Sequence, residues 1–255
     1  MKTMKYKHPI VLSIAGFDPT GGAGVLADVK TCEQHACLGM GVLTSNTIQT
    51  ETEFLAVDWF DRKSIINQLM PILQTYEISA VKIGIIENLD SLVEVITVVK
   101  SVFPRIPIVW DPVLSASSGF ELHASWNQES LDQILGMIDL ITPNVNEVKR
   151  IARMEDEIEA GFHLARLTRV LLKGGHSSER LGVDLLFEEG VPREIPSKSD
   201  STDLSPKHGS GCILSAAIAS NLAHGKHLFE ACQEAKQYIE KRLSSNEHLL
   251  AYHVE

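Results

Sequence analysis

The chain has 255 residues, 44% of them hydrophobic and 22% charged, and its 33 Asp and Glu exceed its 23 Lys and Arg to give a formal net charge of −10. These proportions are typical of a globular protein with a substantial core and exclude extended disorder. The acidic charge, with no cluster of basic residues, disfavours nucleic acid and anionic membranes as partners, and no apolar run reaches the roughly 18 residues of a transmembrane helix.

Short apolar segments rich in β-branched residues alternate with longer segments of helical spacing along most of the chain. The basic N-terminal stretch leads into an apolar run too short for a signal peptide, and we predict a strand there. The predicted strands are residues 10–16, 40–49, 80–86, 106–114, 140–144 and 169–175. The predicted helices between them are residues 24–36, 62–76, 89–103 and 129–138. Strands that are apolar throughout are buried on both faces, so the alternation predicts a mostly parallel sheet covered by helices.

The last third of the chain changes pattern. Alternating residues on either side of Glu189-Gly190 predict a β-hairpin over 182–197, which would form an antiparallel edge of the sheet. Two helices follow, over 211–225 and 227–246, and the small apolar residues of the first predict that it is buried. The expected architecture is a single domain over the whole chain, an α/β three-layer sandwich with a mostly parallel central sheet flanked by helices.

The cysteines indicate a reducing compartment. Cys32, Cys37, Cys212 and Cys232 include no C-x-x-C pair, and four cysteines in a chain of this length make a poor disulfide framework. We therefore expect reduced thiols and a cytoplasmic location.

Ligands of open α/β sheets bind beyond the carboxyl ends of the strands, so the residues that follow the predicted strands are candidates for chemistry. Gly209-Ser210-Gly211-Cys212 stands where a polar loop becomes an apolar helix, and its N–H groups and the helix macrodipole can hold phosphoryl oxygens. The same potential predicts a lowered thiol pKa, with Cys212 partly thiolate near neutral pH. A small buried cysteine at a helix start explains the residue equally well on local grounds.

Other residues at strand ends suit a polyphosphate with Mg²⁺. Asp111 in "WDP" and Glu147 in "TPNVNE" offer carboxylates to Mg²⁺, directly or through water, and Lys173 in "LLKGGH" can neutralise phosphate charge. Asn144 adds an amide, although a helix cap after Pro143 also explains "TPNVNE". The glycine-rich "AGFDPTGGAGVLAD" matches neither a dinucleotide fingerprint nor a Walker loop; it can hold a polar ligand or serve only as a turn.

Seven stretches form a collinear set over nearly the whole chain: "SIAGFDPTGGAGVLADVKT", "VLTSNTIQT", "VKIGII", "VWDPV", "LITPNVNE", "VLLKGGH" and "HGSGCILSAAIASNLAHG". In this order they resemble the hydroxymethylpyrimidine and phosphomethylpyrimidine kinases of thiamine biosynthesis, which belong to the ribokinase-like superfamily. The resemblance implies phosphorylation of 4-amino-5-hydroxymethyl-2-methylpyrimidine with ATP and Mg²⁺, followed by phosphorylation of its monophosphate.

The resemblance also implies roles for single residues. Cys212 matches the catalytic base, in a position where ribokinases carry aspartate, and Gly209, Ser210 and Gly211 complete the catalytic turn. Gln49 would hydrogen-bond the aminopyrimidine edge. The remaining residues of the substrate pocket would be Gly16, Ala23, Asp28, Thr47, Ile85 and Val113. The ATP side would comprise Asp111, Asn144, Glu147, Lys173 and His208, with Asp111 and Glu147 holding Mg²⁺.

Two segments depart from the family pattern. After "DPV" the chain reads "LSASSGFEL", with Ser117 in place of a lysine and Phe120 in place of an aspartate. The lost lysine bears on the second phosphorylation, because a monophosphate substrate needs additional positive charge, and Lys207 before His208 is expected to compensate. The C-terminal "SSNEHLLAYHVE" replaces a glycine- and proline-rich signature of the family.

Two other functions stay open. Pyridoxal kinase is a sister branch with the same sheet and ATP site, although Gln49 favours an aminopyrimidine. A non-catalytic pyrimidine-binding protein would explain the altered "LSASSGFEL" loop but not the presence of Cys212, Lys173, Glu147 and Asp111 together. Members of the family are often homodimers, and "VKTCEQHACLGMGVLTSN" offers apolar surface that either pairs with a second copy or is buried in the monomer.

Overall fold

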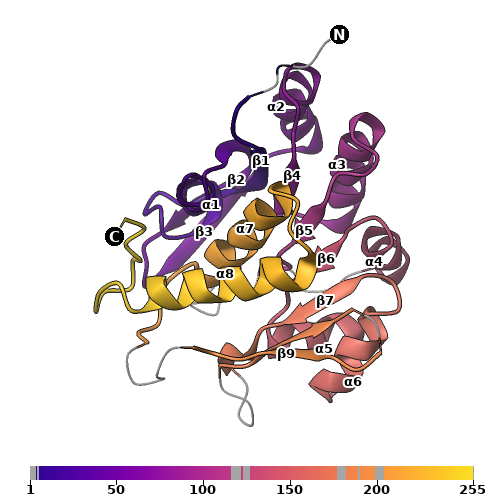
Figure 1. Ribbon diagram of the computed structural model, residues 1–255. Helices are drawn as coiled ribbons and strands as arrows, with labels where there is room; N and C mark the ends of the chain where they lie inside the picture. The colour runs from indigo at the N-terminus through magenta and orange to yellow at the C-terminus, as the bar shows by residue number, and fades with distance from the viewer. Residues whose placement is uncertain are drawn as a thin grey trace.

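The computed structural model describes residues 4, 6–115, 122, 127–176, 182–188, 190–198 and 204–254. The strands within these residues form one sheet in the order β3-β2-β1-β4-β5-β6-β7-β8-β9 (Figure 1). The parallel strands are β1 (Ile10–Phe17), β2 (Leu38–Gln49), β4 (Ala80–Ile83), β5 (Ile108–Trp110), β6 (Leu140–Ile141) and β7 (Arg169–Leu172). The antiparallel strands are β3 (Phe54–Trp59) at one edge and the pair β8 (Asp184–Phe187) and β9 (Arg193–Ile195) at the other.

Helices cover both faces of this sheet, and the buried apolar residues divide into two cores accordingly. One face is covered by α2 (Arg62–Thr75), α3 (Leu89–Val102), α4 (Gln128–Leu135), α5 (Val145–Ala152) and α6 (Glu157–Leu164). The other is covered by α1 (Gly24–Gln34), α7 (Ser210–Ala223) and α8 (Leu228–Leu243) (Figure 1). A 3-10 turn, η1 (Gly174–His176), follows β7. The predicted three-layer sandwich with an antiparallel edge hairpin is confirmed.

Helix α7 lies in the middle of its layer, between the sheet and α8. Its residues Ile213 to Asn221 are all buried, as its composition predicts, and small side chains such as Ala216, Ala217 and Ala219 allow close approach from every side. A helix held on all sides presents its N-terminus in a fixed direction. That N-terminus faces the carboxyl ends of the parallel strands, where the sequence predicts the site.

Some elements were not predicted. Strand β3 lies at the edge of the sheet and has no buried residue, with Leu55 and Asp58 exposed. Asp58 interrupts its short apolar run, and the polar stretch "TETE" precedes it. Helices α5 and α6 have eight residues each, which gives helical periodicity little length in which to show. Ser117 and Phe120 of the altered loop lie outside the described residues.

Two expectations from composition can be compared with the structure. Cys32, Cys37, Cys212 and Cys232 are all free thiols, as predicted. Over the described parts of the chain, no helix combines the length and the apolar character that crossing a membrane requires.

Candidate active site

A cavity of about 270 Å³ opens where the parallel strands end, on the side of the α7 N-terminus. Its wall comes from the loop after β1, the ends of β2 and β4, the residues after β5, β6 and β7, and the start of α7. The predicted site residues that line it are Gly16, Ala23, Thr47, Gln49, Ile85, Asp111, Val113, Asn144, Glu147, Lys173, His208, Gly209, Ser210, Gly211 and Cys212. The topology thus brings together residues that are nearly 200 positions apart in the chain.

Asp28 does not belong to this wall, which corrects its predicted place in the substrate pocket. The residue is fully buried in α1, where its Oδ2 accepts hydrogen bonds from Ser13 Oγ at 2.5 Å and from Lys82 Nζ at 2.8 Å. Its other oxygen, Oδ1, is buried with no hydrogen-bond partner among the described residues. Burial raises the pKa of Asp28 more than Lys82 lowers it. Asp28 therefore acts on the cavity through Lys82 and through its charge, without lining the wall.

That partner, Lys82, is the main residue that sequence reasoning missed. It is fully buried in β4 and lines the cavity beside Cys212. Burial is the largest influence and opposes its charge, but Asp28, Cys212 and Asp111 together outweigh burial and raise the pKa of the Lys82 ammonium. The signal in the sequence was a single lysine inside the otherwise apolar strand "AVKI". A buried charge in a central strand needs a partner of opposite charge. Here that partner is Asp28, which is 54 positions away in the sequence.

The turn that begins α7 requires glycine at Gly209 and leaves little room for a side chain at Gly211. Gly209 has φ +73°, and a Cβ there would overlap the carbonyl oxygen of Gly22, so no other residue fits. A Cβ at Gly211 would lie 3.3 Å from both Asp111 Oδ2 and Lys173 Nζ. The helix has no side-chain cap, which leaves its first N–H groups available to an anion.

Cys212 lies in the first turn of α7, half-buried against the cavity. Burial raises the pKa of its thiol to about 11, and the carboxylates of Asp28 and Asp111 act in the same direction. Lys82 and the N–H of Gly24 lower the pKa by less. The expectation of a partly formed thiolate near neutral pH is therefore wrong for the free protein, because burial and the two carboxylates outweigh the groups that lower the pKa.

Asp111, Glu147 and Lys173 form a cluster of charges on the other side of Gly211. Asp111 Oδ1 accepts from Lys173 Nζ at 2.9 Å and from Thr142 Oγ1 at 3.0 Å, while Glu147 Oε2 lies 3.7 Å from the same ammonium. Although burial favours the neutral acid, Lys173 holds the pKa of Asp111 below its usual value. Burial raises the pKa of Glu147. Asn144 and Glu147 also form a capping box, so the local explanation for "TPNVNE" is confirmed without removing either residue from the cavity.

These carboxylates fit a Mg²⁺ ion that is held mainly by other ligands. No group of three or more His, Cys, Asp and Glu side chains able to hold a metal occurs in the described part of the chain. Mg²⁺ keeps several waters and is bound by one or two carboxylates together with substrate phosphates. Asp111 and Glu147, both at the wall and bridged by Lys173, offer those two carboxylates.

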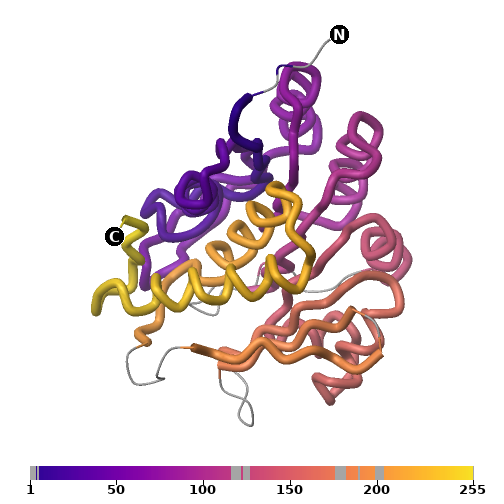
Figure 2. Tube along the Cα trace, in the orientation of Figure 1, coloured from indigo at the N-terminus to yellow at the C-terminus, as the bar shows by residue number. Residues whose placement is uncertain are grey.

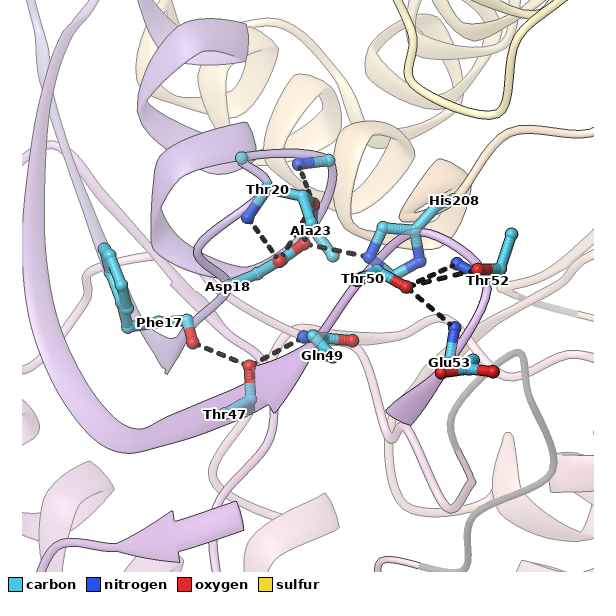
Figure 3. Close-up of polar contacts among 12 residues, drawn as sticks. Phe17, Asp18, Thr20, Ala23, Thr47, Gln49, Thr50, Thr52, Glu53 and His208 are labelled. Carbon is cyan, nitrogen blue, oxygen red and sulfur yellow. Dashed lines mark hydrogen bonds and ion pairs between the residues drawn. The ribbon is translucent and has the colours of Figure 1, made fainter. Parts of the chain in front are cut away.

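On the opposite side, two polar chains orient the wall (Figure 3). Gln49 Nε2 donates to Thr47 Oγ1 at 2.7 Å, and Thr47 in turn donates to the carbonyl of Phe17 at 2.8 Å. His208 Nε2 lies 2.9 Å from Asp18 Oδ2, and Asp18 also accepts from the backbone of Ala23. Burial opposes ionisation, but these hydrogen bonds together lower the pKa of Asp18. His208 thus ties the α7 turn to the loop after β1.

Lys207 does not supply the charge that the altered loop lacks. Its Nζ donates to the carbonyl oxygens of Asn246 at 2.5 Å and His248 at 2.6 Å, in the C-terminal segment, and the residue does not line the cavity. The expected compensation by Lys207 is therefore wrong, because its ammonium is already committed elsewhere.

A second ion pair at the wall was also missed. Asp184 in β8 lies 3.1 Å from Lys236 Nζ in α8 and accepts from the backbone N–H of Gly174 at 2.8 Å. Ile239 and Leu243 extend the α8 side of the wall with apolar surface. Asp184 sits in the antiparallel hairpin, so attention to the ends of parallel strands could not find it.

Comparisons with known proteins agree with this geometry. The model of a family described as phosphomethylpyrimidine kinase matches residues 18–255. A hydroxymethylpyrimidine/phosphomethylpyrimidine kinase of Staphylococcus aureus is 35% identical over 251 residues, which cover 91% of this chain and 87% of that protein. Bacillus subtilis pyridoxal kinase, solved as an ADP complex, superimposes with a TM-score of 0.83 at 27% identity, covering 94% of this chain and 93% of that one. A phosphomethylpyrimidine kinase of Clostridium difficile superimposes with a TM-score of 0.73 at 30% identity, covering 90% and 98%.

Proposed function

The chain belongs to the phosphomethylpyrimidine kinase family, and from that premise we propose that it transfers the γ-phosphoryl group of ATP to the hydroxymethyl group of 4-amino-5-hydroxymethyl-2-methylpyrimidine. The monophosphate formed would be a second substrate, as a step of thiamine diphosphate biosynthesis. The observation that carries the proposal is that Gln49, Cys212 and Lys173 open on one cavity. The reaction needs three groups, which these residues would supply. Gln49 offers an amide to the pyrimidine, Cys212 a thiol to the hydroxyl, and Lys173 an ammonium to the phosphates.

Gln49 would recognise the pyrimidine. Its amide is oriented by Thr47, whose own hydroxyl is fixed by the backbone of Phe17, so the side chain is held before a ligand arrives. A carboxamide offers both a donor and an acceptor, which matches the amino group and the ring nitrogen beside it. An amide fixed in this way loses little entropy when the substrate binds.

The start of α7 and Lys173 would hold the phosphoryl group. Phosphoryl transfer requires positioning and stabilisation of charge on the phosphoryl oxygens more than covalent chemistry. The N–H groups at the uncapped end of α7 and the Lys173 ammonium lie on either side of Gly211, which is small enough to leave that space open. Asp111 and Glu147 would hold Mg²⁺ through water, and that ion would neutralise the charge on the β- and γ-phosphates.

Cys212 would act as the base. In molecules whose Cys212 is deprotonated, the substrate hydroxyl would transfer its proton to the Sγ thiolate as its oxygen forms a bond to the γ-phosphorus, and the bond from that phosphorus to the leaving oxygen of ADP would break. A thiol with a pKa of about 11 is mostly protonated at neutral pH. We therefore expect turnover to rise with pH and the N–H groups of the turn to matter at least as much as the thiol. Lys82, beneath the thiol, favours the thiolate form by its charge.

Pyridoxal is the second candidate substrate. The similarity to Bacillus subtilis pyridoxal kinase, at a TM-score of 0.83, supports it. Gln49 favours the aminopyrimidine, because its carbonyl oxygen would accept a hydrogen bond from the exocyclic amino group, which pyridoxal lacks.

A substrate panel tests the proposal. ADP release is measured with hydroxymethylpyrimidine, its monophosphate and pyridoxal, and the mono- and diphosphate products are separated. We expect kcat/KM to favour hydroxymethylpyrimidine over pyridoxal. A pyridoxal preference of about tenfold or more, about 1.4 kcal/mol of transition-state binding, would overturn the substrate assignment. Absence of ADP with every substrate, together with a ligand-induced rise in Tm, would indicate a non-catalytic pyrimidine-binding protein.

A further inference from the structure

The C-terminal tail, residues 244–254, returns from the end of α8 toward α1 (Figure 2). It is the stretch in which the sequence departs from the family's C-terminal pattern. It contributes nothing directly to the cavity wall, which ends at Leu243 on this side. Its contacts instead reach the two glycine-containing loops that frame the cavity, residues 18–24 and 207–212.

Lys207 joins the tail to the segment before α7. Its ammonium donates to the carbonyl oxygens of Asn246 at 2.5 Å and His248 at 2.6 Å, and only 6% of the residue is exposed. Both acceptors are neutral carbonyl oxygens, so neither brings a negative charge to the ammonium. These two hydrogen bonds replace the hydration that the ammonium loses on burial. Lys207 can therefore stay buried only while the tail is docked, and the tail loses two of its contacts if Lys207 leaves.

Backbone hydrogen bonds continue this connection on both sides of Lys207. The N–H of His208 donates to the carbonyl of Leu249 at 2.9 Å, and the N–H of Ser205 donates to the carbonyl of Leu243 at 3.2 Å. These bonds fix the chain up to the residue before Gly209, whose left-handed conformation begins the α7 turn. The position of the turn thus depends on where the tail lies.

Leu250 connects the tail with the other loop. An ideal Cβ at Gly22 would lie 2.7 Å from both Leu250 Cδ2 and His208 Cδ2, so these two side chains meet over Gly22. The His208 ring continues from there to Asp18, at 2.9 Å. The tail, the α7 turn and the loop after β1 are therefore packed on one another at a single point.

The tail is itself well anchored. Asn246 Nδ2 donates to the carbonyl of Leu250 at 3.1 Å, and its Oδ1 accepts from the N–H of His248 at 2.9 Å, so one side chain shapes the turn that presents both acceptors of Lys207. Farther along, Arg242 of α8 donates to the carbonyl of Tyr252 at 3.0 Å, and Tyr238 hydrogen-bonds His253 at 3.0 Å. Helix α8 thus provides a rigid support for the contact with Lys207.

We propose that the C-terminal tail positions the Gly209–Cys212 turn for phosphoryl transfer, and that Lys207 is the positioning residue that couples the two. The proposal rests on the proposed kinase function. Lys207 touches neither substrate nor cavity, so its influence passes through the backbone of His208 and Gly209 to the N–H groups of α7. A displacement of about 1 Å in a catalytic group can lower a rate about 100-fold, so a small shift of this turn is enough to matter.

Steady-state kinetics of Lys207→Met, Lys207→Arg and Lys63→Met test this role. Lys207→Met keeps the aliphatic stem, Lys207→Arg keeps the charge, and Lys63→Met removes an exposed lysine of α2 as a control. We expect kcat of Lys207→Met to fall about tenfold or more with little change in KM for either substrate, because bound ligands meet a displaced turn. Lys207→Arg should recover most of kcat, and Lys63→Met should match the wild type. A lower Tm with an unchanged kcat per folded molecule would reduce Lys207 to a structural residue.

A truncation that removes residues 246–255 adds a cycle with Lys207→Met. The truncation alone should lower kcat at least as much as Lys207→Met, because it also removes the contacts of Leu249 and Leu250, and the combination should lower kcat no further than the truncation, because the Lys207 contact is already lost. Fully additive losses would overturn the coupling.

Hydrogen exchange tests the same coupling without any substrate. In the full chain, Lys207→Met should raise the exchange of the amides of residues 208–212 and leave those of β4 unchanged. Unchanged exchange at 208–212 would contradict the proposal even if the kinase activity is as proposed. If the wild type phosphorylates none of the tested substrates while exchange responds to Lys207, the kinase assignment fails and the structural coupling remains.

Discussion

Two lysines, the buried Lys82 and the half-buried Lys173, lie near Cys212, and their surroundings differ. Lys82 and Asp28 have no exposed side-chain surface and are 2.8 Å apart beneath α7. Lys173 is 2.9 Å from Asp111 but keeps 16% of its side chain exposed and shares its charge with Glu147. Asp28 forms its side-chain hydrogen bonds with Lys82 and Ser13, inside the protein. The partly exposed Lys173 ammonium, in contrast, can turn to a ligand. We call Lys82 and Asp28 the closed pair and Lys173 and Asp111 the open pair. The closed pair is suited to support the structure and the Cys212 thiol, and the open pair is suited to bind phosphate.

The largest expected effect is on stability at the closed pair. Lys82→Met leaves the Asp28 carboxylate buried without its cation, which should lower the free energy of unfolding by about 3–5 kcal/mol. The double variant Lys82→Met/Asp28→Asn removes both charges and should recover most of that loss. Urea unfolding of the two variants measures the difference, and equal stability of the single and double variants would contradict a coupled pair.

The open pair should respond in activity more than in stability. Lys173→Met removes a donor to the phosphoryl oxygens, and we expect kcat/KM for ATP to fall about 10²–10³-fold. Asp111 keeps its hydrogen bond from Thr142 and lines the cavity, so the stability loss should be smaller than for Lys82→Met. Lys149→Met, which removes a half-buried lysine of α5 that pairs with Glu157 and does not line the cavity, is the control. A variant with wild-type kinetics would remove Lys173 from the phosphate site.

Gln49 should affect only the pyrimidine. Gln49→Leu keeps the size of the side chain but removes its donor and acceptor, and we expect KM for hydroxymethylpyrimidine to rise about 10–100-fold, equivalent to about 1–3 kcal/mol. KM for ATP should stay near the wild-type value. The exposed Gln128→Leu variant serves as control. Equal effects on both substrates would mean that Gln49 supports the cavity without reading the ring.

The smallest expected effect is on the reactivity of the thiol. Because the pKa of Cys212 is raised to about 11, its alkylation by iodoacetamide should increase about tenfold per pH unit from pH 7 to 9.5, without a plateau. Lys173→Met should slow the reaction at each pH, since it removes a cation near the thiolate. The double variant Lys82→Met/Asp28→Asn should change it less, because a cation and an anion leave together. Peptide mass spectrometry separates Cys212 from the buried cysteines, and a plateau near pH 7 would contradict a raised pKa.

The sequence predicted most of the cavity wall because a parallel sheet collects its strand ends at one edge. Asp111 and Lys173 directly follow β5 and β7, and Asn144 comes shortly after β6, so knowledge of the strands was enough to place them together. The residues that were missed or misplaced depend on contacts between distant elements. Asp28 lies outside the cavity wall because α1 packs on β1 and β2, where Asp28 Oδ2 accepts hydrogen bonds from Ser13 of β1 and from Lys82 of the neighbouring β4.

Electrostatic expectations failed for a related reason. A helix start predicts a lowered thiol pKa, but burial and the Asp28 and Asp111 carboxylates, which sequence patterns do not place around Cys212, raise it. The sequence presents Lys207 as a free cation beside the site. The folded tail shows that its ammonium already donates to the carbonyl oxygens of Asn246 and His248. A local sequence pattern predicts the direction in which one group shifts a pKa. The net shift depends on all the groups that the fold packs around the residue.

The most direct measurement of the central claim is kcat of Cys212→Ala and Cys212→Ser with hydroxymethylpyrimidine, followed against pH. If Cys212 is the base at the α7 turn, Cys212→Ala should lose about 100-fold or more in kcat, and the rise of kcat with pH seen in the wild type should disappear. Cys212→Ser should keep part of the activity, because the N–H groups of the turn remain. Wild-type turnover in Cys212→Ala would contradict the assignment.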